Sequence, residues 1–343
     1  MKKIAIVTIE SANYGNRLQN YALQTVLQSM GVEVKTLHRE TIDCSAKEQI
    51  KRLMQNIFQT KASKFRRFDG RIEFSKIVIG RDYYPIGISS QFDYFVVGSD
   101  QVWNPYYDFV AGKCDFLTFA NDNQKISYAA SFGVSEIPLD RVKDYAEKLK
   151  TFSALSVREK HAARIVKDLT NREATVVLDP TLLLKASEWK IVENKSKYMP
   201  KSKYVFVYAL GTMCQRFKDK IRSLEKEYVI FDVRAIQKNG RELPIGPAEF
   251  LYLLRNADFV LTDSFHATVF SILYHKRFIT FNRLGINMNS RIKSLAELID
   301  IQEWINKYGE LECEKIIDYT SVDEILAKER KKSIDFLREA LNN

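Results

Sequence analysis

Residues 4 to 37 follow the order strand, polar loop, helix, strand, and this alternation constrains the fold more than any other feature. An apolar run from Ile4 to Ile9 precedes the loop, a helical pattern extends from Leu18 to Met30 and closes at Gly31, and Val32 to Leu37 is apolar again. Such a crossover is right-handed and makes the two strands parallel. The loop lacks the GxGxxG pattern of dinucleotide-binding folds. The chain is therefore predicted to begin as an α/β domain.

The same alternation starts afresh in the second half. The lysine-rich stretch from 190 to 203, with Pro200, is typical of a linker. With 343 residues the chain exceeds the size at which one core usually keeps growing. We therefore expect an N-terminal domain over residues 1–190, a linker over 190–203 and a C-terminal domain over 200–343 that includes the last helix. Both are expected to be Rossmann-like, doubly wound α/β domains that face a central cleft.

The composition of the chain limits which kinds of partner and which cellular compartment are expected. The formal net charge of +10 favours nucleic acid, an anionic membrane face or acidic small molecules as partners. No dominant basic tract with interleaved aromatics is present, so nucleic acid is not expected. The N-terminal apolar run is short and ends at Glu10, which favours a strand over a signal peptide. Four cysteines without paired spacing argue against zinc and disulfides and favour a cytoplasmic protein.

A strand, a turn and a helix follow one another between Ala257 and Ile279. His266 therefore falls at a helix N-terminus beyond the carboxyl end of a strand, where ligands bind in open α/β sheets. Free N–H groups at such a helix end favour anions. The structural alternative is that Asp263 or Ser264 caps the helix and His266 is a hydrogen-bonded bystander.

Two earlier strands also run into polar clusters. Asn16, Arg17 and Asn20 follow the first strand and suit a polyhydroxylated or anionic ligand, although such residues also cap helices. After the strand from Phe92 to Val97, a second cluster supplies a carboxylate, two amides and an aromatic ring, a set typical of carbohydrate recognition. Its members are Asp100, Gln101, Trp103 and Asn104. The alternative there is a turn with a core tryptophan.

Two basic features of the sequence each allow two interpretations. Arg158 occupies another junction between a strand and a helix, where a guanidinium can grip phosphate or carboxylate, or can pair with Glu159. From Ala46 to Phe68, apolar residues recur at helical spacing among lysines and arginines. Such a stretch lies either on an anionic membrane surface or, as a docked helix, on the protein.

Six blocks of sequence, in this order and spacing, are similar to the polysaccharide pyruvyl transferase family over essentially the whole chain. They are Asn13 to Gln24, Val97 to Asn104, Ser131 to Gly133, Ser156 to Glu159, Leu178 to Thr181 and Thr262 to Ala267. The resemblance implies a GT-B-like fold of two Rossmann-like domains. It also implies transfer of an enolpyruvyl-derived group from phosphoenolpyruvate to a glycan, which forms a pyruvate ketal.

The resemblance also implies roles for the residues above. His266 is expected to be the general acid, and Asp100 to orient or deprotonate the acceptor hydroxyl. Donor-binding residues are expected in the C-terminal domain and at Arg158; they are Arg158, Ser264, Phe265 and Arg291. Acceptor-binding residues are expected in the N-terminal domain; they are Asn16, Arg17, Asn20, Gln101, Trp103 and Asn104. No metal is expected, and no cofactor besides phosphoenolpyruvate as a co-substrate.

One position departs from the family pattern. Ser264 stands where characterised relatives can have an arginine that grips the donor. Arg291 or Arg17 could supply that charge instead. Finding the cation that replaces the arginine is therefore a question for the structure.

Two other functions fit the sequence. A GT-B glycosyltransferase would use the same basic cleft for a nucleotide sugar. A non-catalytic glycan-binding protein would keep the cluster from Asp100 to Asn104 and would not need His266. For the transferase, the resemblance points to a lipid-linked glycan acceptor of surface polysaccharide synthesis. The protein is then expected in the cytoplasm, with peripheral contact at the inner face of the cell membrane as an option.

Overall fold

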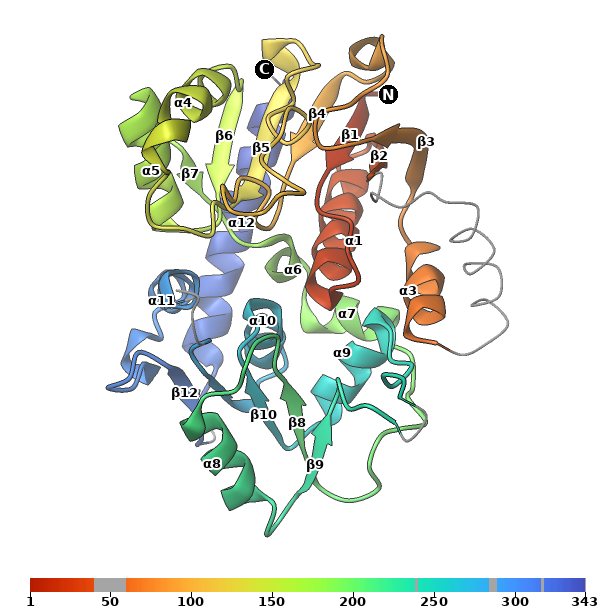
Figure 1. The fold of residues 1–343 in the computed structure, drawn as a ribbon, viewed down its shortest axis with the longest axis vertical. Helices are drawn as coiled ribbons and strands as arrows, with labels where there is room; N and C mark the ends of the chain where they lie inside the picture. The colour runs from red at the N-terminus through yellow and green to blue at the C-terminus, as the bar shows by residue number, and fades with distance from the viewer. Residues whose placement is uncertain (40–59, 238–239, 284–288, 316–317, 343) are drawn as a thin grey trace. The chain divides into compact units, whose positions relative to one another are not determined.

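The chain forms two compact units in the computed structural model (Figure 1). The structure describes residues 1–39, 60–237, 240–283, 289–315 and 318–342. Unit 1 comprises Met1–Arg52, Asp69–Leu183 and Ala327–Asn343, and unit 2 comprises Leu53–Phe68 and Leu184–Leu326. The two units are described separately.

Unit 1 is built on a parallel sheet, with seven strands among the residues described, in the order β3-β2-β1-β4-β5-β6-β7. The strands are β1 Lys3–Val7, β2 Glu33–Arg39, β3 Phe74–Ile79, β4 Tyr94–Val97, β5 Lys125–Ala130, β6 Ala154–Val157 and β7 Thr175–Val176. The strand order reverses direction between β1 and β4. Ligands bind at such a switch point, beyond the carboxyl ends of the strands.

Helices and a long loop cover the sheet of unit 1. The helices are α1 Tyr14–Ser29, α4 Val142–Lys150, α5 Lys160–Thr170 and α6 Pro180–Leu183, with short 3₁₀ turns at Ile88–Gln91, Asp122–Gln124 and Leu139–Arg141. Alternate residues of β1 and β4 point to one face and join a core with the aromatic rings of the loop after β4; they include Ala5, Val7, Phe95 and Val97. This core fixes the ends of β1 and β4, where the polar clusters begin.

Unit 2 has a smaller sheet, with five strands among the described residues, in the order β12-β11-β10-β8-β9. Its strands are β8 Tyr204–Tyr208, β9 Val229–Asp232, β10 Phe259–Thr262, β11 Arg277–Thr280 and β12 Leu311–Cys313; only the β11–β12 pair is antiparallel. Its helices are α3 Lys61–Asp69, α7 Ala186–Val192, α8 Gln215–Leu224, α9 Pro247–Asn256, α10 Phe265–Leu273 and α11 Asn289–Leu298, with a 3₁₀ turn at Gln302–Trp304.

The last helix, α12 Thr320–Asn342, is shared between the units, unlike the predicted division. Its second half packs in unit 1, where Leu337 is fully buried and Phe336 lies 6.4 Å from the ring of Tyr128. The Ser333 hydroxyl accepts a hydrogen bond of 3.0 Å from the backbone N–H of Leu178. The apolar face of this helix therefore completes the core of unit 1, although it ends the chain.

The predicted linker is also placed differently. The division between the units falls at Leu183 and Leu184, before the stretch 190–203. Within that stretch Glu193 pairs with Arg255 at 2.7 Å, and the N–H of Asn194 donates to the carbonyl of Ala248 at 3.1 Å. The lysine-rich segment is therefore held against α9 as part of unit 2.

The basic stretch from Ala46 to Phe68 lies partly outside the described residues, from 46 to 59. Its described part includes α3, in which Phe65 and Phe68 are buried. Lys61 pairs with Glu242 at 2.8 Å and Lys64 pairs with Glu249 at 2.7 Å, both within unit 2. These contacts favour the docked helix over a membrane-binding one. Among the described residues, no helix is both long enough and apolar enough to cross a bilayer.

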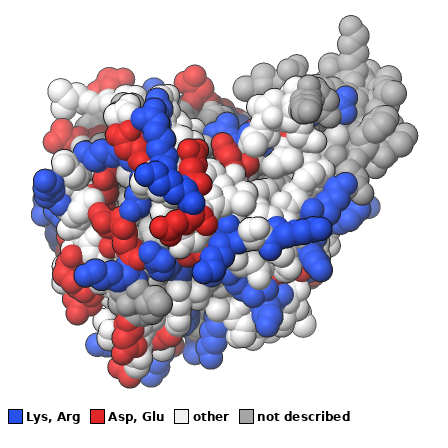
Figure 2. Space-filling view, turned by 90° about the horizontal axis from the view of Figure 1, so that it is seen from below, with Lys and Arg blue, Asp and Glu red and all other residues white. Residues whose placement is uncertain are grey.

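On the face shown in Figure 2, Lys and Arg side chains alternate with Asp and Glu over the left half, whereas Lys and Arg predominate in a band toward the right.

Candidate functional site

Asp100 lies just beyond the carboxyl end of β4, in a segment that requires unusual backbone angles. Gly98 has a φ of 119°, and a Cβ atom there would lie 2.2 Å from the carbonyl oxygen of Tyr128. Only glycine fits that approach. Asp100 itself has a φ of 72°, in the left-handed region that non-glycine residues seldom adopt. Strained residues of this kind cluster at functional sites.

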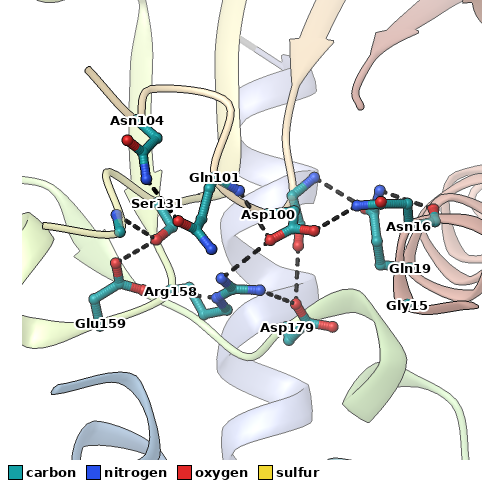
Figure 3. Close-up of polar contacts among 12 residues, drawn as sticks. Gly15, Asn16, Gln19, Asp100, Gln101, Asn104, Ser131, Arg158, Glu159 and Asp179 are labelled. Carbon is teal, nitrogen blue, oxygen red and sulfur yellow. Dashed lines mark hydrogen bonds and ion pairs between the residues drawn. The ribbon is translucent and has the colours of Figure 1, made fainter. Parts of the chain in front are cut away.

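The carboxylate of Asp100 is held from three directions, as Figure 3 shows. The Asn16 side-chain amide donates to Oδ2, and the backbone N–H of Gln101 donates to Oδ1 at 2.9 Å. The guanidinium of Arg158 donates to Oδ1 at 3.5 Å. Asn16 comes from the first turn of α1, after β1, so these contacts lie at the switch point between β1 and β4. The side chain of Asp100 is 13% exposed, so its carboxylate is fixed in direction and still reached by solvent.

Arg158 is surrounded by carboxylates. Besides Asp100, it pairs with Asp179 at 3.0 Å and with Glu159 at 3.6 Å, and its side chain is 3% exposed. Burial lowers its pKa, but the three carboxylates raise the pKa by more, so the guanidinium stays charged.

This environment differs from the expectation that Arg158 grips an anionic donor. The positive charge of Arg158 is already offset by three negative charges, which would repel phosphate or carboxylate. Its contacts hold Asp100 and Asp179 in place beside it. The Ser99 hydroxyl also donates to Asp179, at 2.9 Å, which ties the β4 loop to the same group.

Gln101 lies next to Asp100, and Asn104 contacts Gln101 (Figure 3). The Asn104 amide donates to Gln101 Oε1 at 2.7 Å. Gly133, with a φ of 65°, makes room for this pair, because a Cβ atom there would lie 2.0 Å from Gln101 Oε1. The Ser131 hydroxyl donates to Glu159 in the same group, at 2.5 Å. Three of the predicted acceptor residues are thus brought together, counting Asn16.

Two other predicted acceptor residues make contacts elsewhere in unit 1. Arg17 pairs with Asp69 at 2.6 Å and lies 3.9 Å from Glu10. Asn20 accepts a hydrogen bond of 2.8 Å from the hydroxyl of Thr36 on β2. These contacts fix α1 against its neighbours, and they do not include the group around Asp100.

Trp103 is a core residue. Its ring is fully buried, stacks on Phe116 at 5.9 Å and lies 5.2 Å from Phe132. Its Nε1–H donates to the carbonyl of Asp115 at 3.0 Å. The ring offers no exposed face to a sugar, so the alternative of a core tryptophan is the one that the structure supports. The sequence pattern could not separate the two, because the partners of the ring lie far along the chain.

In unit 2, the turn from β10 into α10 carries the predicted donor residues. Ser264 is the N-cap of α10 and accepts from the N–H of Ala267 at 3.5 Å. Phe265 and His266 form the first turn, with their rings 5.4 Å apart in an edge-on contact, and His266 is 7% exposed. The structure therefore confirms the helix N-terminus that the sequence predicts at His266. Arg291 lies on α11 and is 6% exposed.

Arg283 is the arginine that the sequence analysis missed. It follows β11, and its Nε donates to Oδ2 of Asp263 at 3.2 Å while Nη2 donates to the Asp263 carbonyl at 3.2 Å. Asp263 directly precedes Ser264, so a guanidinium lies beside the N-terminus of α10. Gly211 makes room for it, because a Cβ atom there would lie 2.6 Å from Arg283 Cγ. The signal was available: Arg283 stands three residues beyond a strand's carboxyl end.

Asp263 organises this edge of the unit 2 sheet. Its carboxylate accepts from the backbone N–H groups of Leu210 at 2.6 Å and Gly211 at 2.8 Å, beyond the end of β8. A further arginine, Arg234, follows β9 and donates to the carbonyl of Ala209 at 2.9 Å. Arg234, Arg283 and the N-terminus of α10 therefore stand at the carboxyl ends of β9, β11 and β10, and each arginine also pairs with one carboxylate, Glu242 or Asp263. An arginine beside a helix N-terminus favours an anion.

Comparison with solved structures supports the fold. The UDP-GlcNAc 2-epimerase of Methanocaldococcus jannaschii is 14% identical, with a TM-score of 0.50 over 95% of this chain and 99% of that chain. The UDP-GlcNAc 2-epimerase of Neisseria meningitidis is 12% identical, with a TM-score of 0.47 over 96% of this chain and 100% of that chain. At 14% identity, the similarity to the Methanocaldococcus jannaschii enzyme shows the fold alone. It confirms the GT-B-like α/β class with two sheets.

Comparison with protein families identifies the chain. No curated protein sequence matches it. The sequence model of the family described as polysaccharide pyruvyl transferase matches residues 13–284, a range that contains both Asp100 and His266. This protein therefore belongs to the polysaccharide pyruvyl transferase family.

Proposed function

We propose that this protein transfers the enolpyruvyl-derived group of phosphoenolpyruvate to two hydroxyls of one sugar, forming a pyruvate ketal. The acceptor is a surface polysaccharide of the bacterial type or its lipid-linked precursor, and the reaction takes place in the cytoplasm. The observation that carries the proposal is the Asp100 carboxylate, held by Asn16, Gln101 and Arg158 at the switch point of a chain in this family.

Unit 1 supplies the acceptor side in this proposal. A carboxylate fixed by three donors can accept the proton of a sugar hydroxyl as that hydroxyl attacks. The side-chain amides of Gln101 and Asn104 lie beside it and can hydrogen-bond further hydroxyls. The carboxylates around Arg158 suit a neutral, polyhydroxylated ligand better than an anionic one.

Unit 2 supplies the donor side. Phosphoenolpyruvate carries a phosphate and a carboxylate, which the N-terminus of α10 and the guanidinium of Arg283 can hold. Arg283 then takes the place of the arginine that Ser264 lacks. His266, in the first turn of α10, delivers a proton to the donor or to the departing phosphate.

The reaction balances without a redox partner. A proton adds to C3 of the enolpyruvyl group, and the oxygen of one sugar hydroxyl bonds to C2. The second hydroxyl then displaces phosphate from C2 and closes the ketal ring. Both hydroxyl protons leave with acid–base groups or phosphate, so the products are one ketal and one inorganic phosphate.

The test is to incubate the purified protein with phosphoenolpyruvate and a panel of lipid-linked and synthetic glycosides of galactose, mannose and N-acetylmannosamine. We expect phosphate release that depends on one acceptor, together with the mass of the pyruvate ketal. Parallel titrations with UDP- and GDP-sugars check the glycosyltransferase alternative. Binding of a nucleotide sugar without any response to phosphoenolpyruvate would replace the proposal with that alternative.

A further inference from the structure

Three aromatic residues follow Asn104 closely in the sequence; two are exposed, and the third, Tyr107, is partly buried against the core of unit 1. Tyr106 is 69% exposed and Phe109 is 49% exposed, while Tyr107 stacks on Phe109 with ring centroids 5.3 Å apart. We call Tyr106, Tyr107 and Phe109 the aromatic platform. Neighbouring exposed apolar side chains of this kind mark a binding surface more often than chance exposure.

The backbone that carries the platform is fixed by arginines. The Arg141 guanidinium donates to the carbonyl of Pro105, Arg39 donates to the carbonyl of Phe109 at 3.4 Å, and Arg81 donates to the carbonyl of Val110 at 3.1 Å. A loop held in this way presents its rings in one arrangement. Preorganised rings bind a ligand with a small loss of conformational entropy.

The platform is joined to Asp100 by a short chain of hydrogen bonds. The N–H of Tyr106 donates to Asn104 Oδ1 at 2.9 Å, and the Asn104 amide donates to Gln101 Oε1 at 2.7 Å. The N–H of Gln101 then donates to the Asp100 carboxylate at 2.9 Å. The backbone that carries the rings is therefore tied to the carboxylate within one loop.

We propose that the aromatic platform is a subsite for a second sugar of the acceptor glycan, adjoining the sugar that receives the pyruvate ketal. This inference rests on the proposed function. Sugar rings present apolar C–H faces that pack on aromatic rings, and the tyrosine hydroxyls can hydrogen-bond sugar hydroxyls. The platform thus performs the stacking that the sequence analysis assigned to Trp103.

The composition of the platform favours a glycan over a membrane surface. Asp108, between Tyr107 and Phe109, is exposed, and its carboxylate would be repelled by anionic lipid headgroups. Gln101, which is partly exposed and next to Asp100, adds an amide on the same loop. Rings accompanied by an amide and a carboxylate match a polyhydroxylated ligand, whose hydroxyls need hydrogen-bond partners.

The test compares a methyl monosaccharide with a disaccharide that ends in the same sugar. In the wild-type protein we expect a kcat/KM for pyruvyl transfer about tenfold higher for the disaccharide, which corresponds to about 1.4 kcal/mol. The double variant Tyr106→Ala/Phe109→Ala should lose this preference and keep the kcat/KM for the monosaccharide and the KM for phosphoenolpyruvate. The control is Tyr94→Ala, a tyrosine at the amino end of β4, at the opposite edge of the sheet.

Binding measured without the donor separates this inference from the proposed function. Saturation-transfer NMR with the same disaccharide should show saturation of the ring protons of the second sugar, and the double variant should lose it. If no acceptor reacts with phosphoenolpyruvate, the proposed function fails and the NMR result still decides the subsite. A double variant that keeps the disaccharide preference and the saturation would overturn the subsite. A wild-type protein that shows neither the disaccharide preference nor the saturation would also overturn it. So would a double variant whose only loss, measured by cosedimentation, is binding to anionic vesicles.

Discussion

The carboxyl edges of the two sheets carry opposite electrostatic characters. At the edge of unit 1, one buried arginine is shared by three carboxylates, of which Asp100 keeps 13% of its side chain exposed. At the edge of unit 2, Arg283 and the N-terminus of α10 meet around the single carboxylate of Asp263. Both edges are built from the same strand and helix pattern, so the difference lies in the side chains at the strand ends. One edge suits hydroxyls and the other suits an anion.

The largest expected effect tests the proton donor of unit 2. Replacing His266 by Ala should lower kcat by about 10²–10⁴-fold, because a general acid contributes that much. The control His275→Ala changes an exposed histidine of the same unit and should leave kcat within about twofold. Phosphate release under saturating phosphoenolpyruvate measures both. Unchanged turnover in the His266 variant would show that His266 is not the acid and would leave unit 2 without an assigned proton donor.

The next effect tests the buried arginine of unit 1. Replacing Arg158 by Ala leaves its three carboxylates uncompensated and should lower the free energy of unfolding by about 3–5 kcal/mol. Urea unfolding measures the change. The control Arg338→Ala removes an exposed ion pair and should change the free energy of unfolding by less than about 1 kcal/mol.

Arg158→Lys separates positioning from donor binding. A lysine keeps the charge but cannot hold Asp100 and Asp179 with a planar fork. We expect a lower kcat and a shifted acidic limb of the pH profile, with the KM for phosphoenolpyruvate unchanged. A raised KM for phosphoenolpyruvate alone would instead support the donor-binding role first predicted for Arg158.

A smaller effect tests Arg283. Its replacement by Ala should raise the KM for phosphoenolpyruvate by about tenfold or more, because a charge-assisted hydrogen bond contributes about 1.5–3 kcal/mol. The KM for the glycan should not change. Arg222→Ala, an exposed arginine of unit 2, is the matched control. If the Arg283 variant instead changed only the KM for the glycan, the acceptor would be assigned to unit 2 and the donor to unit 1.

The smallest expected effect is a pH dependence of stability that arises from the pair of His38 and Glu10 in unit 1. The hydrogen bond that the His38 ring donates to the Glu10 carboxylate raises the pKa of His38 above its ordinary 6.5. Burial raises the pKa of Glu10, but hydrogen bonds from His38 and Arg39 lower it by more, below its ordinary 4.5. The stabilisation by Glu10 is therefore complete above pH 4.5 and is lost as pH falls through its folded pKa. The stabilisation by His38 is complete below pH 6.5 and is lost as pH rises through its folded pKa.

Replacing His38 by Ala should therefore cost more stability at about pH 5.5 than at about pH 8.5. His38 is 41% exposed on its side chain, so the difference should stay below about 1 kcal/mol. Urea unfolding of both proteins at the two pH values measures it. An equal cost at both values would show that His38 acts only through its stacking on Phe74.

Much of the fold and part of each site could be predicted from the chain itself. Strand ends and helix starts are local patterns, so the sequence placed Asp100 and Asn16 at the edge of one sheet and Ser264 and His266 at the edge of another. The roles of these residues, and the cleft expected between the domains, stay predictions that the experiments above address.

Other features were decided only by the tertiary structure, because burial and partners depend on segments that are distant in sequence. The sequence predicts Arg158 as an anion ligand, and only the structure shows that Asp100 and Asp179 are brought to it from opposite directions along the chain. Trp103 became a core residue because Phe116 and Phe132 close over it, and the second half of α12 joined unit 1 because Leu337 is buried there. By itself the sequence determined where the polar residues stand along each strand and helix, and tertiary packing determined which of them are buried and which partners they contact.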